Sequence, residues 1–242
     1  MRFEITENEP LTDAVWDLRL TGDTGAISRP GQFVQVALPG FYLRRPISVC
    51  AWGPASLRLV YKVLGQGTEA MTHLQPGDAL DLLTGLGNGF DPRALGESPL
   101  LVGGGVGLPP LLGLAEALLQ AGKAPQVLAG FNRAEEVFLT EDFRALGIPV
   151  LITTLDGSLG LKGLVTDALP SLRFDSLAAC GPLPMLKALH RAVQGVPALY
   201  SLEERMGCGF GACMGCSIET ASGPARVCRE GPVFRGEELM WA

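Results

Sequence analysis

Four cysteines lie close together near the C-terminus, with the spacing C-x4-C-x2-C-x11-C. They are Cys208, Cys213, Cys216 and Cys228. The gaps between the first three hold mostly glycine and other small residues, so backbone N–H groups can approach the sulfur atoms without obstruction by Cβ atoms. A C-x4-C-x2-C run with a more distant fourth cysteine is typical of a 2Fe–2S cluster, whose irons are held by thiolates. The segment therefore predicts an iron–sulfur centre and a part in electron transfer.

Two other uses of four cysteines agree less well with the sequence. Structural zinc sites commonly use two C-x2-C pairs, and here only Cys213 and Cys216 form one. Disulfides belong to oxidising compartments, but the chain begins with no basic-then-apolar signal segment. Moreover, 6 cysteines in 242 residues are far fewer than a disulfide scaffold contains. These features favour the cluster and predict a cytoplasmic location.

Charge and hydropathy argue against two kinds of partner. The formal net charge of −6 lacks the basic excess that nucleic-acid binding needs. Residues 99–115 carry no charge, but glycines and prolines interrupt them, and a spanning helix needs about 20 consecutive apolar residues. We therefore expect neither nucleic-acid binding nor insertion into a membrane.

Residues 1–98 contain short apolar runs separated by Pro-Gly and Gly-Pro turns. Several short strands at this spacing predict an antiparallel β-barrel or sandwich. One short helix is expected near residues 68–74. The predicted strands are residues 14–20, 32–38, 47–52, 57–63 and 79–83.

Residues 99–202 show a different rhythm, in which buried strands alternate with helices. Such alternation predicts an α/β domain with a parallel sheet and helices on both faces. Residues 203–242 form the small C-terminal cysteine segment. The predicted strands are residues 100–102, 126–131, 150–154, 177–180 and 198–202, and the predicted helices are residues 109–121, 141–146, 164–169 and 183–193.

Glycines crowd the turn after the first strand of the predicted parallel sheet, at Gly103, Gly104, Gly105 and Gly107. A glycine turn that leads into a helix lets a pyrophosphate approach backbone N–H groups, so it indicates a nucleotide site. The pattern is not G-x-G-x-x-G, however, and glycine turns also occur in α/β folds that bind no nucleotide.

Cys180 and Gly181 end another strand of that sheet. Ligands of open parallel sheets lie beyond the carboxyl ends of the strands, so Cys180 is a candidate neighbour of a nicotinamide. Buried free cysteines are more often part of the core, and both interpretations stay open.

In the first part, residues 44–48 read Arg-Arg-Pro-Ile-Ser, and residues 65–68 read Gly-Gln-Gly-Thr at the start of the short helix. A guanidinium and a hydroxyl on an extended segment can bind a flavin or its phosphates. A glycine turn at a helix start is a second candidate phosphate site. A surface arginine pair and a helix cap are equally consistent with these residues.

Taken in order, the R-P-x-S segment, the G-x-G-T turn, the glycine turn of the parallel sheet and the C-G-P strand end resemble the ferredoxin-reductase superfamily. The cysteine segment and residues 201–207 before it are similar to one branch, the electron-transfer subunits of NAD-linked dihydroorotate dehydrogenases. Residues 86–90, 156–158 and 233–236 share this similarity. The resemblance implies FAD in the barrel, NAD in the α/β domain and the 2Fe–2S cluster in the cysteine segment.

The resemblance also implies site residues. The four cysteines match the cluster ligands. Lys62 stands where an arginine is common, and a lysine keeps the charge but loses the bidentate fork. The positions that match FAD contacts are Arg45, Pro46, Ile47, Ser48, Val60, Tyr61, Lys62, Gly67 and Thr68.

The activity that the resemblance implies is a relay in pyrimidine biosynthesis. A partner catalytic subunit carrying FMN oxidises dihydroorotate, and electrons reach NAD+ through the 2Fe–2S cluster and FAD of this chain. The implied assembly is a heterotetramer of two subunits of each kind. Whether NAD or NADP is preferred depends on the residues after the second parallel strand, near Arg133.

Three alternatives remain. One is the small subunit of a ferredoxin:NAD(P) or sulfide-linked oxidoreductase, in which an aspartate often replaces one cluster cysteine. Another is a free-standing reductase for an oxygenase, whose ferredoxin-like domain is longer. The third is a non-enzymatic, redox-sensing iron–sulfur module, which has no need of the flavin and nicotinamide turns.

Overall fold

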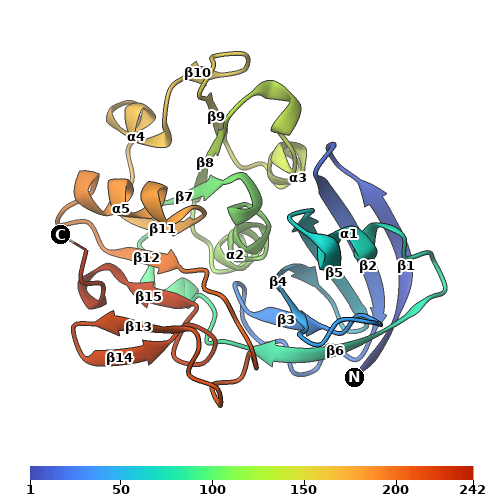
Figure 1. Cartoon of the computed structure of the whole chain (residues 1–242). Helices are drawn as coiled ribbons and strands as arrows, with labels where there is room; N and C mark the ends of the chain where they lie inside the picture. Colours follow the sequence, from blue (N-terminus) through green and yellow to red (C-terminus); the bar gives the residue numbers. More distant parts are fainter. Residues whose placement is uncertain (242) are drawn as a thin grey trace.

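The computed structural model describes residues 1–241 of the chain. Figure 1 shows a closed antiparallel barrel beside a larger, mainly parallel sheet, with the C-terminal segment packed below that sheet. The fold class expected from the sequence is thereby confirmed. None of the described helices combines the length and apolarity that crossing a bilayer requires.

Six strands close the barrel in the order β1-β2-β5-β4-β3-β6. All five strands expected here are present, whereas β1 was not predicted, because only Phe3 and Ile5 of its nine residues are buried. The short helix α1 (Gln66–Thr72) follows β5 as expected. The barrel strands are β1 (Arg2–Pro10), β2 (Val15–Gly22), β3 (Phe33–Val36), β4 (Arg45–Trp52), β5 (Ser56–Lys62) and β6 (Ala79–Leu86).

The second sheet has the order β10-β9-β8-β7-β11-β12-β15, and all its strands except β15 run parallel. The five strands and four helices expected here are found, and the two-residue strand β10 is an addition. The strands are β7 (Pro99–Gly104), β8 (Gln126–Phe131), β9 (Val150–Thr154), β10 (Leu161–Lys162), β11 (Ser176–Cys180), β12 (Ala198–Ser201) and β15 (Val233–Arg235). The helices are α2 (Pro109–Gln120), α3 (Thr140–Ala145), α4 (Val165–Ala168) and α5 (Leu183–Ala192), with 3-10 turns at Pro92–Ala94, Gly105–Gly107, Ala134–Glu136, Leu169–Ser171 and Gly236–Glu238.

Helices cover both faces of this sheet because neighbouring strand residues point to opposite faces. Leu101 of β7 packs in one core cluster with residues of α2 and α3, such as Phe143. Leu100 and Val102 pack in a second cluster with residues of α4 and α5, such as Leu186. Figure 1 shows α2, in green, on the side of the sheet that faces the barrel.

The barrel and the parallel sheet share an interface built around α2 and α3. A Cβ atom on Gly113 of α2 would lie 3.1 Å from the carbonyl oxygen of Cys50 in β4, so a glycine lets the helix approach the barrel closely. Arg58 of β5 forms an ion pair with Asp17 at 2.9 Å and a second one with Asp142 of α3. Apolar packing and a half-buried charge pair therefore hold the two parts together.

The cysteine segment contains a small hairpin and one strand of the larger sheet. The hairpin consists of β13 (Ser217–Thr220) and β14 (Gly223–Arg226), and β15 pairs antiparallel with β12. None of these three strands was predicted, since runs of three or four residues show no periodicity of their own. Pairing with β12 fixes the end of the segment against the sheet.

Candidate functional site

The fold brings the four cysteines of the C-terminal segment close to one another. Cys208 is half-buried, Cys213 is exposed, and Cys216 and Cys228 are buried. The backbone N–H of Cys213 donates to Cys208 Sγ, and that of Cys228 donates to Cys216 Sγ. Cys208 and Cys228 are near enough to interact electrostatically. The four sulfur atoms thus form two adjoining pairs.

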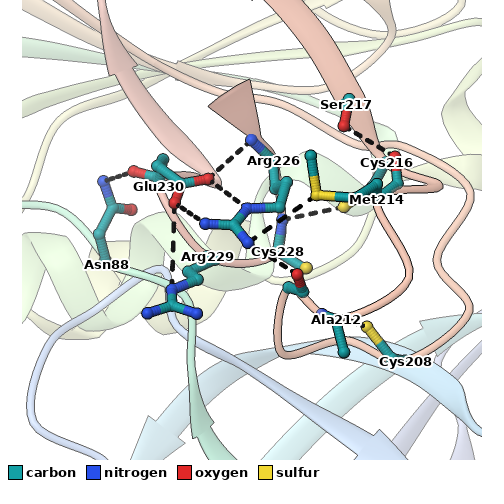
Figure 2. Close-up of polar contacts among 11 residues, drawn as sticks. Asn88, Cys208, Ala212, Met214, Cys216, Ser217, Arg226, Cys228, Arg229 and Glu230 are labelled. Carbon is teal, nitrogen blue, oxygen red and sulfur yellow. Dashed lines mark hydrogen bonds and ion pairs between the residues drawn. The ribbon is translucent and has the colours of Figure 1, made fainter. Parts of the chain in front are cut away.

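Backbone N–H groups surround the first of these sulfur atoms. The N–H of Ala212 donates to Cys208 Sγ at 3.2 Å (Figure 2). The N–H of Cys213 donates to the same sulfur at 3.4 Å. Burial alone raises the pKa of Cys208, but these donors and that of Phe210 lower it to about 6. Thiolates are the form that binds metals, so the lowered pKa makes Cys208 a better metal ligand.

Cys228 has the opposite tendency. Its burial, together with the neighbouring Cys216 thiol, raises its pKa to about 12. Its own backbone N–H donates to Cys216 Sγ at 3.4 Å. Because a bound metal deprotonates a coordinating thiol outright, Cys228 is expected to ionise as the metal centre assembles.

The pairing of the cysteines matches the ligand set of a two-iron cluster. A 2Fe–2S cluster takes two thiolates per iron, which two adjoining pairs provide. A glycine keeps space beside one thiol, since a Cβ atom on Gly207 would lie only 3.3 Å from Cys213 Sγ. These cysteines therefore fit a 2Fe–2S cluster.

Polar contacts tie the cysteine segment to itself and to the barrel (Figure 2). Arg226 forms an ion pair with Glu230 and donates to the carbonyl oxygen of Gly211 at 2.7 Å. Asn88, just after β6, donates to the carbonyl oxygens of Glu230 and Val233, both at 2.8 Å, and its Oδ1 accepts from the Val233 N–H at 3.1 Å. These contacts fix the position of the loop that carries Cys228.

The expected flavin segment lies on β4, next to the strand that contacts the cysteine segment. In the register of β3 and β4, Pro46 is opposite Gln35 and Ser48 is opposite Phe33. Paired residues of adjacent strands share one face of the sheet. Phe33 packs in the core cluster that includes Cys216 and Cys228. Pro46, which is exposed, and Ser48, which is half-buried, therefore lie on the same barrel face as Phe33, beside the cysteine segment.

The structure also brings together Arg45, Gly67 and Thr68, which the sequence analysis placed in two separate motifs. A Cβ atom on Gly67 would lie 2.0 Å from Arg45 Nε, so the guanidinium rests directly on the start of α1. The same guanidinium lies 4.8 Å from the centre of the Phe41 ring. Thr68 Oγ1 accepts hydrogen bonds from the N–H groups before the helix. Arg45, Gly67 and Thr68 thus form one positively charged site at the start of α1, here called the cationic corner.

Residues 60–62, the second segment expected to contact FAD, have side chains in three different environments. Tyr61 is 1% exposed inside the barrel, where its hydroxyl donates to Asn8 Oδ1 at 3.2 Å and burial raises its pKa. Val60 is buried in the interface with α2. Lys62 is exposed. Of these three residues, only Lys62 presents a side chain to a molecule outside the barrel.

The two segments expected to bind nicotinamide meet at one edge of the parallel sheet. Chain order reverses between β7 and β11, and ligands of open α/β sheets bind at this switch point. Gly103 and Gly104 end β7, Gly105 has a left-handed φ of +52°, and a Cβ atom on Gly107 would lie 2.0 Å from the carbonyl oxygen of Cys180. A Cβ atom on Gly181 would likewise lie close to the backbone nitrogen of Gly104, at 3.0 Å.

Cys180 itself is 1% exposed and packs in the core cluster that contains α2. Burial raises the pKa of its thiol. The backbone of Cys180 faces the glycine turn, while its side chain is part of the core.

Three residues near the site were not identified from the sequence. Phe41 supports Arg45, and Asn88 anchors the cysteine loop; residue 88 entered the sequence analysis only as part of a similarity. Gln35 could have been noticed, because it is the one polar residue of the strand Phe33–Val36. Asn88 and Gln35 act through contacts between distant parts of the chain, whereas Phe41 is a near neighbour of Arg45 in the sequence.

Comparisons with known proteins agree with this geometry. Residues 203–240 match the model of the iron–sulfur cluster binding domain of dihydroorotate dehydrogenase B. The electron transfer subunit of dihydroorotate dehydrogenase B (NAD+) from Bacillus pumilus is 38% identical, over 97% of this chain and 96% of its own length. The corresponding subunit from Geobacillus thermodenitrificans is 40% identical, over 99% and 98%. The chain belongs to this family of electron transfer subunits.

Solved structures support the family assignment. An NADH-dependent reduced ferredoxin-NADP oxidoreductase superimposes with a TM-score of 0.89 at 32% identity, covering 99% of this chain and 90% of its own. A ferredoxin NADP+ reductase from Neisseria gonorrhoeae, solved with bound FAD and NADP, gives a TM-score of 0.69 at 17% identity, over 79% and 89%. The latter shows the fold alone. Both the superfamily and the branch indicated by the sequence motifs are confirmed.

Proposed function

We propose that this chain is the electron-transfer subunit of a NAD-dependent dihydroorotate dehydrogenase. It accepts electrons released by dihydroorotate oxidation in a catalytic partner subunit and delivers them to NAD+. One observation supports this above all: the cysteine segment reaches the barrel face that carries Pro46 and Ser48, since Gly209 lies against Gln35, and Phe33 shares a core cluster with Cys216 and Cys228. A cluster and a flavin held there are neighbours within one chain.

The flavin site that we propose lies on the barrel, residues 1–98. Arg45, Gly67 and Thr68 supply a cationic corner and a helix start for the FAD phosphates. Pro46, Ile47 and Ser48 continue along β4, and the exposed Lys62 adds a second positive charge. Because the side chains of Val60 and Tyr61 are buried elsewhere, we expect their contribution to come from backbone groups.

The nicotinamide site that we propose lies on residues 99–202, at the switch point. Gly103, Gly104, Gly105 and Gly107 leave the backbone open to a pyrophosphate, and α2 begins directly behind them. The backbone of Cys180 and Gly181 forms the opposite wall. Residues 203–242 are the third part of the chain and carry the cluster ligands.

Glu136 favours NAD over NADP. It follows β8, where the adenosine ribose is recognised in such sheets. Its carboxylate accepts from Asn132 Nδ2 at 2.8 Å and lies 3.5 Å from Arg133 Nε. A carboxylate suits a ribose hydroxyl and repels a 2′-phosphate, and here it also neutralises the nearby arginine.

The chemistry of the three groups is complementary: a cluster transfers single electrons, a nicotinamide accepts hydride, and a flavin converts between the two. The chain's own residues would hold these groups. Phe33 of the barrel and the buried Cys216 and Cys228 of the cysteine segment belong to one apolar cluster that joins the two parts.

As an electron-transfer subunit, the chain works with a catalytic partner. We propose that this partner carries FMN, that two copies of each subunit assemble, and that the complex acts in cytoplasmic pyrimidine biosynthesis. Phe210 and Met214, 54% and 53% exposed, flank the exposed Cys213. We expect the partner to cover these apolar side chains, which brings its flavin close to the cluster.

A second candidate is the small subunit of a ferredoxin:NAD(P) oxidoreductase, which the 0.89 TM-score of one such structure favours. Four cysteine ligands and the higher identity to dihydroorotate dehydrogenase subunits support the first proposal.

The test is co-expression with a candidate dihydroorotate-oxidising subunit, followed by anaerobic purification and an assay of NAD+ reduction. We expect flavin and cluster absorbance in the purified complex and NADH formation with dihydroorotate. Activity with a ferredoxin or sulfide donor in place of dihydroorotate would select the second candidate. A complex without flavin and cluster absorbance would refute both.

A further inference from the structure

Gln35 is a fully buried polar side chain in an otherwise apolar strand. It is 0% exposed, and neither Oε1 nor Nε2 has a hydrogen-bond partner among the described residues. Burying an amide with both polar atoms unpaired is unfavourable. Gln32, only three residues earlier, shows the normal pattern, since its amide donates to the Gly87 carbonyl and accepts from the N–H groups of Ser28 and Arg29.

The position of Gln35 on the barrel is determined by strand alternation. Val34 and Val36 point into the barrel core, so Gln35 and Phe33 point outward. On this outer face Gln35 lies opposite Pro46 of the expected flavin segment. Its side chain therefore emerges between the flavin segment and the cysteine segment.

The amide of Gln35 rests directly on the cysteine loop. A Cβ atom on Gly209 would lie 2.5 Å from Gln35 Nε2 and 2.9 Å from Cδ. Gly209 has a left-handed φ of +78° and immediately follows the ligand Cys208. Glycine at this position thus serves both the loop conformation and the close approach of the amide.

We propose that Gln35 is a positioning residue for the cluster: its amide N–H, unpaired among the described residues, would donate to a sulfur of the bound cluster on the Cys208 side and raise the cluster's reduction potential. This inference rests on the proposed function, because it requires that the cysteines hold a 2Fe–2S cluster. Hydrogen bonds to the sulfurs are one of the factors that set such potentials, since a donor stabilises the additional negative charge of the reduced cluster. The side chain then links the flavin-bearing face of the barrel to the cluster beside it.

The test is a potentiometric titration of the flavin- and cluster-loaded protein, followed by EPR of the reduced cluster. Gln35→Met keeps the volume and removes the donor, and we expect the ratio of reduced to oxidised cluster at a fixed potential to fall about 3- to 10-fold. A tenfold change corresponds to about 59 mV for one electron. Gln35→Glu keeps the shape and replaces the amide with a carboxyl group whose pKa is raised by burial. In its ionised form, at high pH, it removes the donor and adds a negative charge, so we expect a larger decrease there than at low pH. The midpoint of the flavin should move less than that of the cluster.

Gln32→Met is the matched control, because its amide is fully paired and does not contact the cysteine loop. We expect it to lower the stability of the barrel and to leave the cluster midpoint unchanged. If Gln35→Met assembles no cluster, Gln35→Glu carries the test. Loaded Gln35 variants with the wild-type midpoint would overturn this inference alone. A wild-type protein with no cluster signal would overturn the proposed function as well.

Discussion

The barrel and the cysteine segment are held in shape by different interactions. The barrel closes around a continuous apolar core, in which Phe3, Leu18 and Leu59 are completely buried. The cysteine segment has strands of three or four residues, and its loop takes left-handed conformations at Gly209, Gly211 and Met214. The first region owes its stability to burial, and the second to tethers and bound metal.

This difference has a functional meaning. A cluster loop must let four thiols and several N–H groups converge, which leaves little room for apolar side chains. The barrel compensates by offering a rigid outer face, formed by β3 and β4, on which the loop docks. Substitutions in the two regions should therefore separate global stability from cluster retention.

Loss of a ligand should have the largest effect. Cys213→Ser replaces an exposed thiol, so packing is preserved while one ligand is lost. We expect the cluster absorbance to disappear and dihydroorotate-driven NAD+ reduction in the complex to fall by more than about 100-fold. Bound flavin and NADH oxidation by ferricyanide should persist. Cys50→Ala, in the core far from the segment, is the control and should keep its cluster.

A cavity in the barrel core should lower the global stability of the protein and leave the cluster in place. Leu59→Ala is expected to lower the free energy of unfolding by about 2–5 kcal/mol in a urea titration, because Leu59 is fully buried. Cluster absorbance below the transition should match the wild type. Leu64→Ala, at a 78% exposed position, should change stability by less than about 0.5 kcal/mol. Cluster release from Leu59→Ala without global destabilisation would refute the distinction.

The tether should give an intermediate effect confined to the cysteine segment. Asn88→Ala removes two donors and one acceptor between the barrel side and the segment, worth about 1–3 kcal/mol locally. We expect iron to be lost to a chelator about 10- to 100-fold faster, with a smaller change in the urea midpoint. Asn88→Asp keeps the acceptor for the Val233 N–H, so its rate of iron loss should lie between those of the wild type and Asn88→Ala. Equal rates for all three proteins would show that Asn88 is no tether.

The smallest effect should come from Glu230. Its hydrogen-bonded ion pair with Arg226 lowers its pKa to about 2, below its ordinary value of 4.5. A lowered pKa stabilises the fold above about pH 4.5, and this contribution is lost as the pH falls toward 2. Glu230→Gln should therefore melt at a lower temperature than the wild type at pH 6, with the difference shrinking by pH 3. A difference that grows in acid would contradict this assignment.

Much of the site could be predicted because its signals are local. The spacing of the cysteines, the glycine turn before α2 and the strand–helix alternation are each contained within a few residues. Gly107 and Cys180 could be placed together because the carboxyl ends of parallel strands meet at one edge.

The remainder depended on tertiary contacts. Strand β15 exists through pairing with β12, and β1 buries only two apolar side chains. The direction of Tyr61 into the barrel follows from a hydrogen bond to Asn8, which is 53 residues away. The contact between Gln35 and Gly209 joins strands and loops from opposite ends of the chain. No pattern in the sequence carries such information.

The central claim is that this chain alone holds a flavin and a 2Fe–2S cluster in electronic contact. The most direct measurement is an anaerobic titration of the isolated subunit with NADH, followed by visible absorbance and EPR. We predict that NADH bleaches the flavin and produces the signal of one reduced 2Fe–2S cluster per chain. Flavin bleaching with a cluster that stays oxidised, or no cluster signal even after dithionite, would contradict the account.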